Sequence, residues 1–168
     1  MSGVKISVSN LLRTGRDERG FKNLVGSKMS CLDFQDYAEC VKYGFHMFLG
    51  YDAFTLNALK VGGQGGVGRD YNYFGELFCG IMNAFDKGDI STATKLTEKS
   101  KELIQMINDI NPNLPMFKYL MGVLRGVDLG GCRLPLPKLS EEHKQMIGEK
   151  LDKVRYLCCL EIRESATF

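Results

Sequence analysis

The sequence lacks the ligand spacing of a metal site. It has no tryptophan and only two histidines, and none of its six cysteines forms a Cys-x-x-Cys pair. His46 and His143 are far apart along the chain and distant from any cluster of cysteines. Zinc and related metals need closely spaced His, Cys or carboxylate ligands. We therefore expect no metal site, and we expect Cys40 and Cys79, which fall within amphipathic patterns, to be buried thiols.

The sequence also lacks an excess of charge of one sign. Its 22 basic and 20 acidic residues give a net charge of +2, which offers no electrostatic argument for a nucleic-acid or membrane partner. No apolar run approaches the roughly 20 residues that cross a bilayer. Residues 1–5 do not follow the pattern of a signal peptide. We expect a cytoplasmic protein with no membrane segment and no nucleic-acid partner.

The first 70 residues alternate between strand and helix patterns. Strand-like runs at 24–28, 45–49 and 65–67 are separated by helical patterns at 33–43 and 54–61. Strands and helices that alternate with short links are typical of βαβ units and a parallel sheet. The strands are almost wholly apolar, which predicts that both faces of the sheet are covered.

The rest of the chain has only helical patterns. We expect helices from Tyr71 to Gly88, from a cap at Asp89 onward with Ile90 and Ala93 on its inner side, near 115–125, and after a cap at Ser140. The link 126–139 is rich in turn residues. We therefore predict a single domain over 1–168, with a strand-helix part at about 1–87 and a helical extension at about 88–160.

Lys28 is the residue most suggestive of chemistry. In the run Asn23-Leu24-Val25-Gly26-Ser27-Lys28-Met29-Ser30, a short apolar strand delivers a lysine to its carboxyl end, where parallel α/β folds place their active sites. A free lysine has a pKa of about 10.4, and burial favours its neutral amine, which can attack a ketone to form an imine. The alternative is a strand-end lysine that extends into solvent.

Three other segments are candidate binding sites. The spacing Gly-x-Gly-x-x-Gly at Gly63 is preceded by a helical pattern, so we expect close backbone packing or ligand approach there and not a dinucleotide site. Asp52, after Gly50, could bind a substrate hydroxyl or cap a helix that begins near Ala53. Arg69 could pair with the next aspartate or contact an anion. Arg133 could tie its turn to a helix end.

Taken together, five blocks of sequence resemble the N-acetylneuraminate lyase family, within the dihydrodipicolinate synthase-like superfamily. The order and spacing of the blocks hold from about Gly3 to about Leu157. The blocks are Ser2-Gly3-Val4-Lys5-Ile6, Val25-Gly26-Ser27-Lys28-Met29-Ser30, Gly50-Tyr51-Asp52, Gly65-Gly66-Val67-Gly68 with Tyr71-Asn72, and Arg133-Leu134-Pro135-Leu136.

The resemblance implies an α/β fold, a partial (β/α)8 barrel made of about the last three strands and a C-terminal helical extension. Lys28 would be the Schiff-base lysine of a class I aldolase that cleaves N-acetylneuraminate to pyruvate and N-acetylmannosamine. Ser30 would line the pocket, and Gly50 and Asp52 would contact the sugar. The family needs no metal or organic cofactor and usually forms a homotetramer. Its proton-shuttling tyrosine has no counterpart in these residues.

Two departures from the family pattern bear on the substrate. Ala53 stands where sialic acid lyases generally have Glu, and Arg69 where they have Ser. Both positions would line the part of the pocket that holds the glycerol tail of the sugar, so another 2-oxo acid aldolase or a dehydratase is an alternative. A second alternative is a non-catalytic half-barrel, because a partial barrel has unpaired edges that favour association with itself or with a full-length subunit.

Overall fold

The computed structural model describes residues 23–164. The block Ser2 to Ile6 that supports the resemblance lies outside the described residues. The chain divides into two compact units, Met1–Gly68 and Arg69–Phe168. The division puts residues 71–87 with the helices, whereas the sequence patterns grouped them with the strands. Each unit is described by itself.

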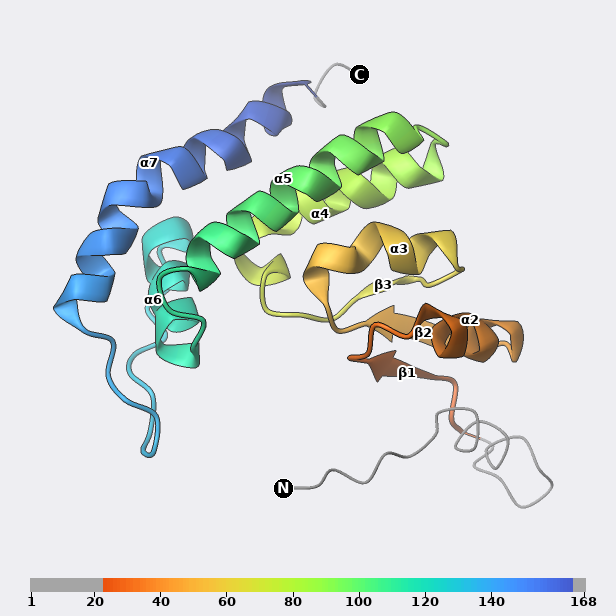
Figure 1. The fold of residues 1–168 in the computed structure, drawn as a ribbon, viewed down its shortest axis with the longest axis horizontal. Helices are drawn as coiled ribbons and strands as arrows, with labels where there is room; N and C mark the ends of the chain where they lie inside the picture. The colour runs from red at the N-terminus through yellow and green to blue at the C-terminus, as the bar shows by residue number, and fades with distance from the viewer. Residues whose placement is uncertain (1–22, 165–168) are drawn as a thin grey trace. The chain divides into compact units, whose positions relative to one another are not determined.

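The first unit is a three-stranded parallel sheet with helices in its connections (Figure 1). The strands β1 (Gly26–Met29), β2 (His46–Leu49) and β3 (Gly65–Gly66) lie in the order β1-β2-β3. Between them are α2 (Phe34–Lys42), a 3-10 helix η1 (Asp52–Phe54) and α3 (Thr55–Lys60). The predicted parallel sheet is confirmed, with each strand shorter than its apolar run.

Local signals set the ends of these helices. The Asp33 carboxylate accepts hydrogen bonds from the Gln35 and Asp36 backbone N–H groups at 3.0 and 3.2 Å, so Asp33 is the N-cap of α2. After α3, Gly62 has a φ of +89°, a conformation that residues with a Cβ adopt only with strain. The chain can therefore turn there and enter β3.

The core of the first unit lies on one face of the sheet only. Buried side chains alternate along β2, with Met47 and Leu49 inside. They pack in one cluster with residues of β1 and the helices, namely Met29, Tyr37, Cys40, Phe45 and Ala58. On the other face Lys28 is exposed, and it pairs in register with Phe48. Within the described residues the helices of this unit pack against one face of the sheet, and cover of the other face by a barrel interior stays a prediction.

The second unit consists of helices. They are α4 (Tyr71–Asp86), α5 (Ile90–Asn108), α6 (Leu114–Arg125) and α7 (Glu141–Glu164), and α4 and α5 run side by side (Figure 1). The Asp89 carboxylate accepts from the Thr92 N–H at 2.9 Å, and the Ser140 hydroxyl accepts from the His143 N–H at 3.2 Å. Both predicted caps are confirmed.

Two predictions of burial are wrong in this unit. Cys79 is exposed, whereas Cys40 in α2 is buried as expected. Cys79 follows Phe78 on α4, and one residue of an α-helix rotates the side chain by about 100° away from the buried stripe. Ile90 is 41% exposed because it is the first residue of α5, and the buried stripe begins one turn later at Ala93.

No helix within residues 23–164 is long and apolar enough to cross a membrane. The described residues also contain no group of three or more His, Cys, Asp or Glu side chains that could hold a metal ion.

Candidate active site

The candidate site is at the edge of the sheet where the three parallel strands end. Lys28 lies in β1 and Ser30 follows it, Gly50 follows β2, and Gly68 comes two residues after β3. Parallel strands place their carboxyl ends at one edge, which is where α/β folds bind ligands. The first unit therefore brings together most of the residues that the sequence singled out.

Gly50 makes room for two polar side chains. A Cβ on Gly50 would lie 2.0 Å from the Ser30 Oγ and 2.7 Å from the Lys28 Cε. Its backbone N–H donates to the Met29 carbonyl at 2.9 Å, which fixes the end of β2 against β1. The amine-bearing chain of Lys28 and the hydroxyl of Ser30 thus converge over a backbone that has no side chain of its own. This is the arrangement expected around a bound carbonyl compound.

Asp52 is placed in the same way against Gly68. The aspartate is only 6% exposed, and a Cβ on Gly68 would lie 1.5 Å from its Oδ1. Asp52 is the first residue of η1, and the N-cap positions of η1 and α3 are Tyr51 and Phe54. The alternative in which Asp52 caps a helix beginning near Ala53 is therefore wrong. A buried carboxylate beside the strand ends is consistent with the hydroxyl-binding alternative.

Lys28 and Ser30 are both exposed, and Ala53 is half-buried. Of the two alternatives for Lys28, a buried amine and a strand-end lysine that extends into solvent, the described residues show the second. The physical reason is that Lys28 projects from the sheet face opposite the core, which the helices of the first unit do not cover. Phe48, its register partner, is an apolar residue on this face that the candidate residues did not include. Its signal was the two-residue periodicity, which puts register partners on the same face.

Arg69, the first residue of the second unit, is held by three contacts. Its Nη2 donates to the Asn108 Oδ1 at 2.8 Å, and its Nε donates to the Asp70 Oδ1 at 3.2 Å. Its guanidinium carbon lies 3.9 Å from the centre of the Phe117 ring. The predicted pair with Asp70 is present, and it belongs to a junction of α4, α5 and α6. A role for Arg69 in binding a substrate stays a prediction.

The glycine segment packs closely within the first unit. A Cβ on Gly63 would lie 2.4 Å from the Tyr37 hydroxyl and 2.8 Å from the Ala58 carbonyl oxygen. Gly65 and Gly66 form β3, and the next helix begins only at Tyr71. A dinucleotide fingerprint needs a helix that opens inside the glycine spacing. The expectation of close packing is confirmed, and the geometry of a dinucleotide site is absent from this segment.

Comparison with known proteins agrees with this geometry. The sequence profile of the Dihydrodipicolinate synthetase family matches residues 2–154. The chain belongs to this family. Its sheet and helices are therefore part of a (β/α)8 barrel with its C-terminal helices.

Individual relatives carry the name N-acetylneuraminate lyase. The chain is 32% identical over 158 residues to the Gallus gallus lyase, covering 92% of this chain and 51% of the relative. With the Mus musculus lyase the identity is 28% over 168 residues, covering 98% and 52%. The structure of the Aliivibrio salmonicida lyase, a sialic acid aldolase, matches with a TM-score of 0.79 and 32% identity, covering 92% of this chain and 51% of that one. The chain thus spans about half the length of these relatives.

Proposed function

We propose that this chain carries the nucleophilic lysine, Lys28, of a class I carbon-carbon lyase that cleaves N-acetylneuraminate to pyruvate and N-acetylmannosamine. The observation that carries the proposal is the convergence of Lys28 and Ser30 over Gly50 at the carboxyl edge of a parallel sheet. Membership of the family and the lyase names of the relatives support it. The enzyme would act without a cofactor, in the cytoplasm, as a homo-oligomer such as a tetramer.

The chemistry assigns one role to each group at this edge. The neutral Lys28 amine attacks the keto carbon of the sugar acid, and loss of water gives an iminium. The iminium accepts the electron pair of the breaking carbon-carbon bond while a base takes the proton of the sugar hydroxyl. N-acetylmannosamine leaves with a carbonyl, and protonation and hydrolysis of the enamine release pyruvate and the amine. Ser30 and Asp52 would hold the substrate.

The reaction requires an uncharged amine, and the exposed Lys28 of the described residues lacks the apolar cover that favours this form. The proposal therefore assigns that cover, together with the proton-shuttling base, to the remainder of a complete barrel. The amine by itself is sufficient for adduct formation, whereas turnover needs the positioned base as well.

The direct test is to reduce the imine with borohydride in the presence of pyruvate and to locate the adduct by peptide mass analysis. Two proteins are compared, this chain and a full-length hybrid that joins it to the N-terminal half of the Aliivibrio salmonicida lyase. We expect the adduct on the peptide that contains Lys28, and its loss in Lys28→Met. The matched control is Lys60→Met, which removes an exposed lysine of α3. If Lys28 carries no adduct in either protein, the imine chemistry is rejected.

A related substrate is the second candidate, and Ala53 favours it. Ala53 is half-buried next to Asp52 and supplies no carboxylate to a sugar tail. A site discriminates between substrates by the polar groups that it leaves unpaired. Cleavage of N-acetylneuraminate by the hybrid is compared with cleavage of 2-keto-3-deoxy sugar acids. Faster cleavage of N-acetylneuraminate removes this candidate, and Ala53→Glu should then raise the preference further.

A further inference from the structure

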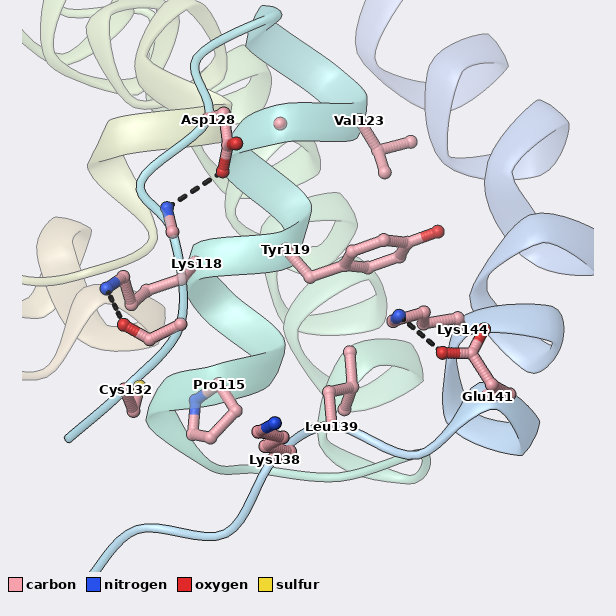
Figure 2. Close-up of a pocket in the computed structure, with 13 residues that line it drawn as sticks. Pro115, Lys118, Tyr119, Val123, Asp128, Cys132, Lys138, Leu139, Glu141 and Lys144 are labelled. Carbon is pink, nitrogen blue, oxygen red and sulfur yellow. Dashed lines mark hydrogen bonds and ion pairs between the residues drawn. The ribbon is translucent and has the colours of Figure 1, made fainter. Parts of the chain in front are cut away.

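A cavity in the second unit lies outside the candidate active site and is built on one face of α6. Pro115, Lys118, Tyr119 and Gly122 line it at helical spacings of three and four residues (Figure 2). The link 126–139 and the first turn of α7 form the opposite wall. The cavity has a volume of about 520 Å³, within the range of 300–1,000 Å³ typical of small-molecule sites.

The floor of this cavity is largely apolar. The Pro115 ring is buried, and the side chains of Tyr119, Val123 and Leu139 are half-buried. Gly122 leaves the middle of the α6 face open, because it has no side chain. Such a floor suits a flat apolar or aromatic body, which gains most from contact with proline and tyrosine rings.

The polar rim has basic groups with unused hydrogen-bond donors. Lys118 Nζ donates to the Gly131 carbonyl at 2.6 Å, and an ammonium has two further donors. Within residues 23–154, Lys138 forms no ion pair and no side-chain hydrogen bond. In Figure 2 Lys138 lies beside Pro115, whereas the Lys118 side chain points away from Tyr119 toward the link.

The acidic groups of the rim already have partners. Asp128 Oδ1 accepts from the Gly130 N–H at 2.8 Å, and Glu141 accepts from Lys144 Nζ at 2.6 Å. The same Lys144 Nζ lies 6.0 Å from the centre of the Tyr119 ring. Three lysines against two acidic residues leave an excess of positive charge, and that excess lies at Lys118 and Lys138.

We propose that this cavity binds a small organic acid, with the carboxylate at Lys138 on the rim and a flat apolar body on Pro115, Tyr119 and Leu139. The site is separate from the chemistry of Lys28, because every residue that lines it belongs to the helical unit. A ligand there would bridge α6, the link and the start of α7, and so would stabilise the helical unit by binding its folded form.

The test uses biphenyl-4-carboxylate as the probe and biphenyl-4-methanol as its neutral counterpart. Backbone amide shifts of the ¹⁵N-labelled chain are followed during titration. We expect the acid to shift amides within residues 115–123, 128–132 and 138–144, and to bind at least about 10-fold more tightly than the alcohol, as one good charge-assisted hydrogen bond provides.

Matched variants make the outcome decisive. Lys138→Glu should weaken binding of the acid about 10-fold, whereas Lys87→Glu, the same charge change at an exposed lysine outside the cavity, should leave it unchanged. Gly122→Leu should abolish binding without unfolding the chain, because a Cβ there would meet only the Val127 carbonyl oxygen at 3.9 Å. Equal binding of acid and alcohol, equal effects of the two lysine variants, shifts outside the cavity, or no binding at millimolar probe would each overturn the proposal.

Discussion

Gly50 and Gly68 lie just after two strand ends, and we expect an added methyl group to affect the site at Gly50 and the stability of the fold at Gly68. A Cβ on Gly50 would collide with Lys28 and Ser30, whose side chains are exposed and free to move. A Cβ on Gly68 would collide with the carboxylate of Asp52, which is buried and cannot move without cost. The first glycine therefore serves the site and the second also serves the fold.

We expect Gly50→Ala to lower borohydride trapping of pyruvate on Lys28 at least about 10-fold while changing the free energy of unfolding by less than about 1 kcal/mol. Gly68→Ala should destabilise by about 1–3 kcal/mol, the usual cost of overpacking. Urea unfolding measures both. Gly148→Ala is the control, since nothing lies within 4 Å of its added methyl group. A large loss of stability in Gly50→Ala would contradict its assignment to the site.

Tyr37 joins the helix layer to the sheet, and its hydroxyl donates to the Met47 carbonyl at 2.7 Å. That carbonyl also accepts from the Gln64 N–H at 3.0 Å, so Tyr37→Phe leaves no unsatisfied acceptor. We therefore expect Tyr37→Phe to cost only about 1 kcal/mol of unfolding free energy. A loss above about 3 kcal/mol in urea unfolding would show that the hydroxyl has a further role.

The same tyrosine predicts a pH dependence. Burial, with a smaller effect of Cys40, raises the pKa of Tyr37 from its ordinary value of 10.0 to about 12. Between these values the folded state keeps a proton that the unfolded state loses, so the contribution of Tyr37 to stability is intact below pH 10 and falls as the pH rises from 10 to 12. Burial also raises the pKa of the Cys40 thiol, from 9.0 to about 11. Unfolding free energies at pH 8 and pH 11 should therefore differ less in Tyr37→Phe than in the parent chain.

At the scale of elements, Arg69 ties three helices together where the sequence suggested a substrate contact. Its bonds reach Asn108 at the end of α5 and Asp70 at the start of α4, and it stacks on Phe117 of α6. Its side chain is 42% exposed, so solvent weakens the ionic part of these contacts. The stacking and the hydrogen bond to Asn108 remain.

We expect Arg69→Ser, which restores the residue of the family pattern, to lower the unfolding free energy of the chain by about 1–2 kcal/mol. Arg133→Ser is the matched control, because Arg133 is exposed and its side chain has no interaction within residues 23–154. Thermal unfolding of both variants measures the effect. If the two variants are equally stable and Arg69→Ser changes the substrate preference of the hybrid, Arg69 binds substrate and the structural role is rejected.

At the scale of the whole molecule, the first unit exposes apolar surface at both edges of its sheet. Val25 is 68% exposed before β1, and Val67 is 51% exposed after β3. Exposed apolar residues around an uncovered sheet favour association. We expect sedimentation of the chain at micromolar concentration to show self-association, and the hybrid barrel to show less exposed apolar surface by dye binding. A monomer over the whole concentration range would count against the half-barrel alternative.

The helices and strands were predictable from the chain because their signals are local. The predicted caps at Asp89 and Ser140 are present. Asp33, which the sequence pattern placed inside a helix, is the N-cap of α2. Errors arose where burial depends on a neighbour. Cys79 has the apolar character of a core residue and faces solvent on α4. For Lys28 the sequence left burial and exposure open, and the side chain is exposed.

The sequence by itself determined the order of the elements, the lysine at the end of the first strand and membership of the Dihydrodipicolinate synthetase family, because periodicity, caps and motif spacing are properties of neighbouring residues. Only the tertiary structure decided that the side chains of Lys28 and Ser30 converge over Gly50, that Arg69 contacts three helices, and that a cavity lies along α6. These facts depend on contacts between residues that are far apart in the sequence, and such contacts are set by tertiary packing.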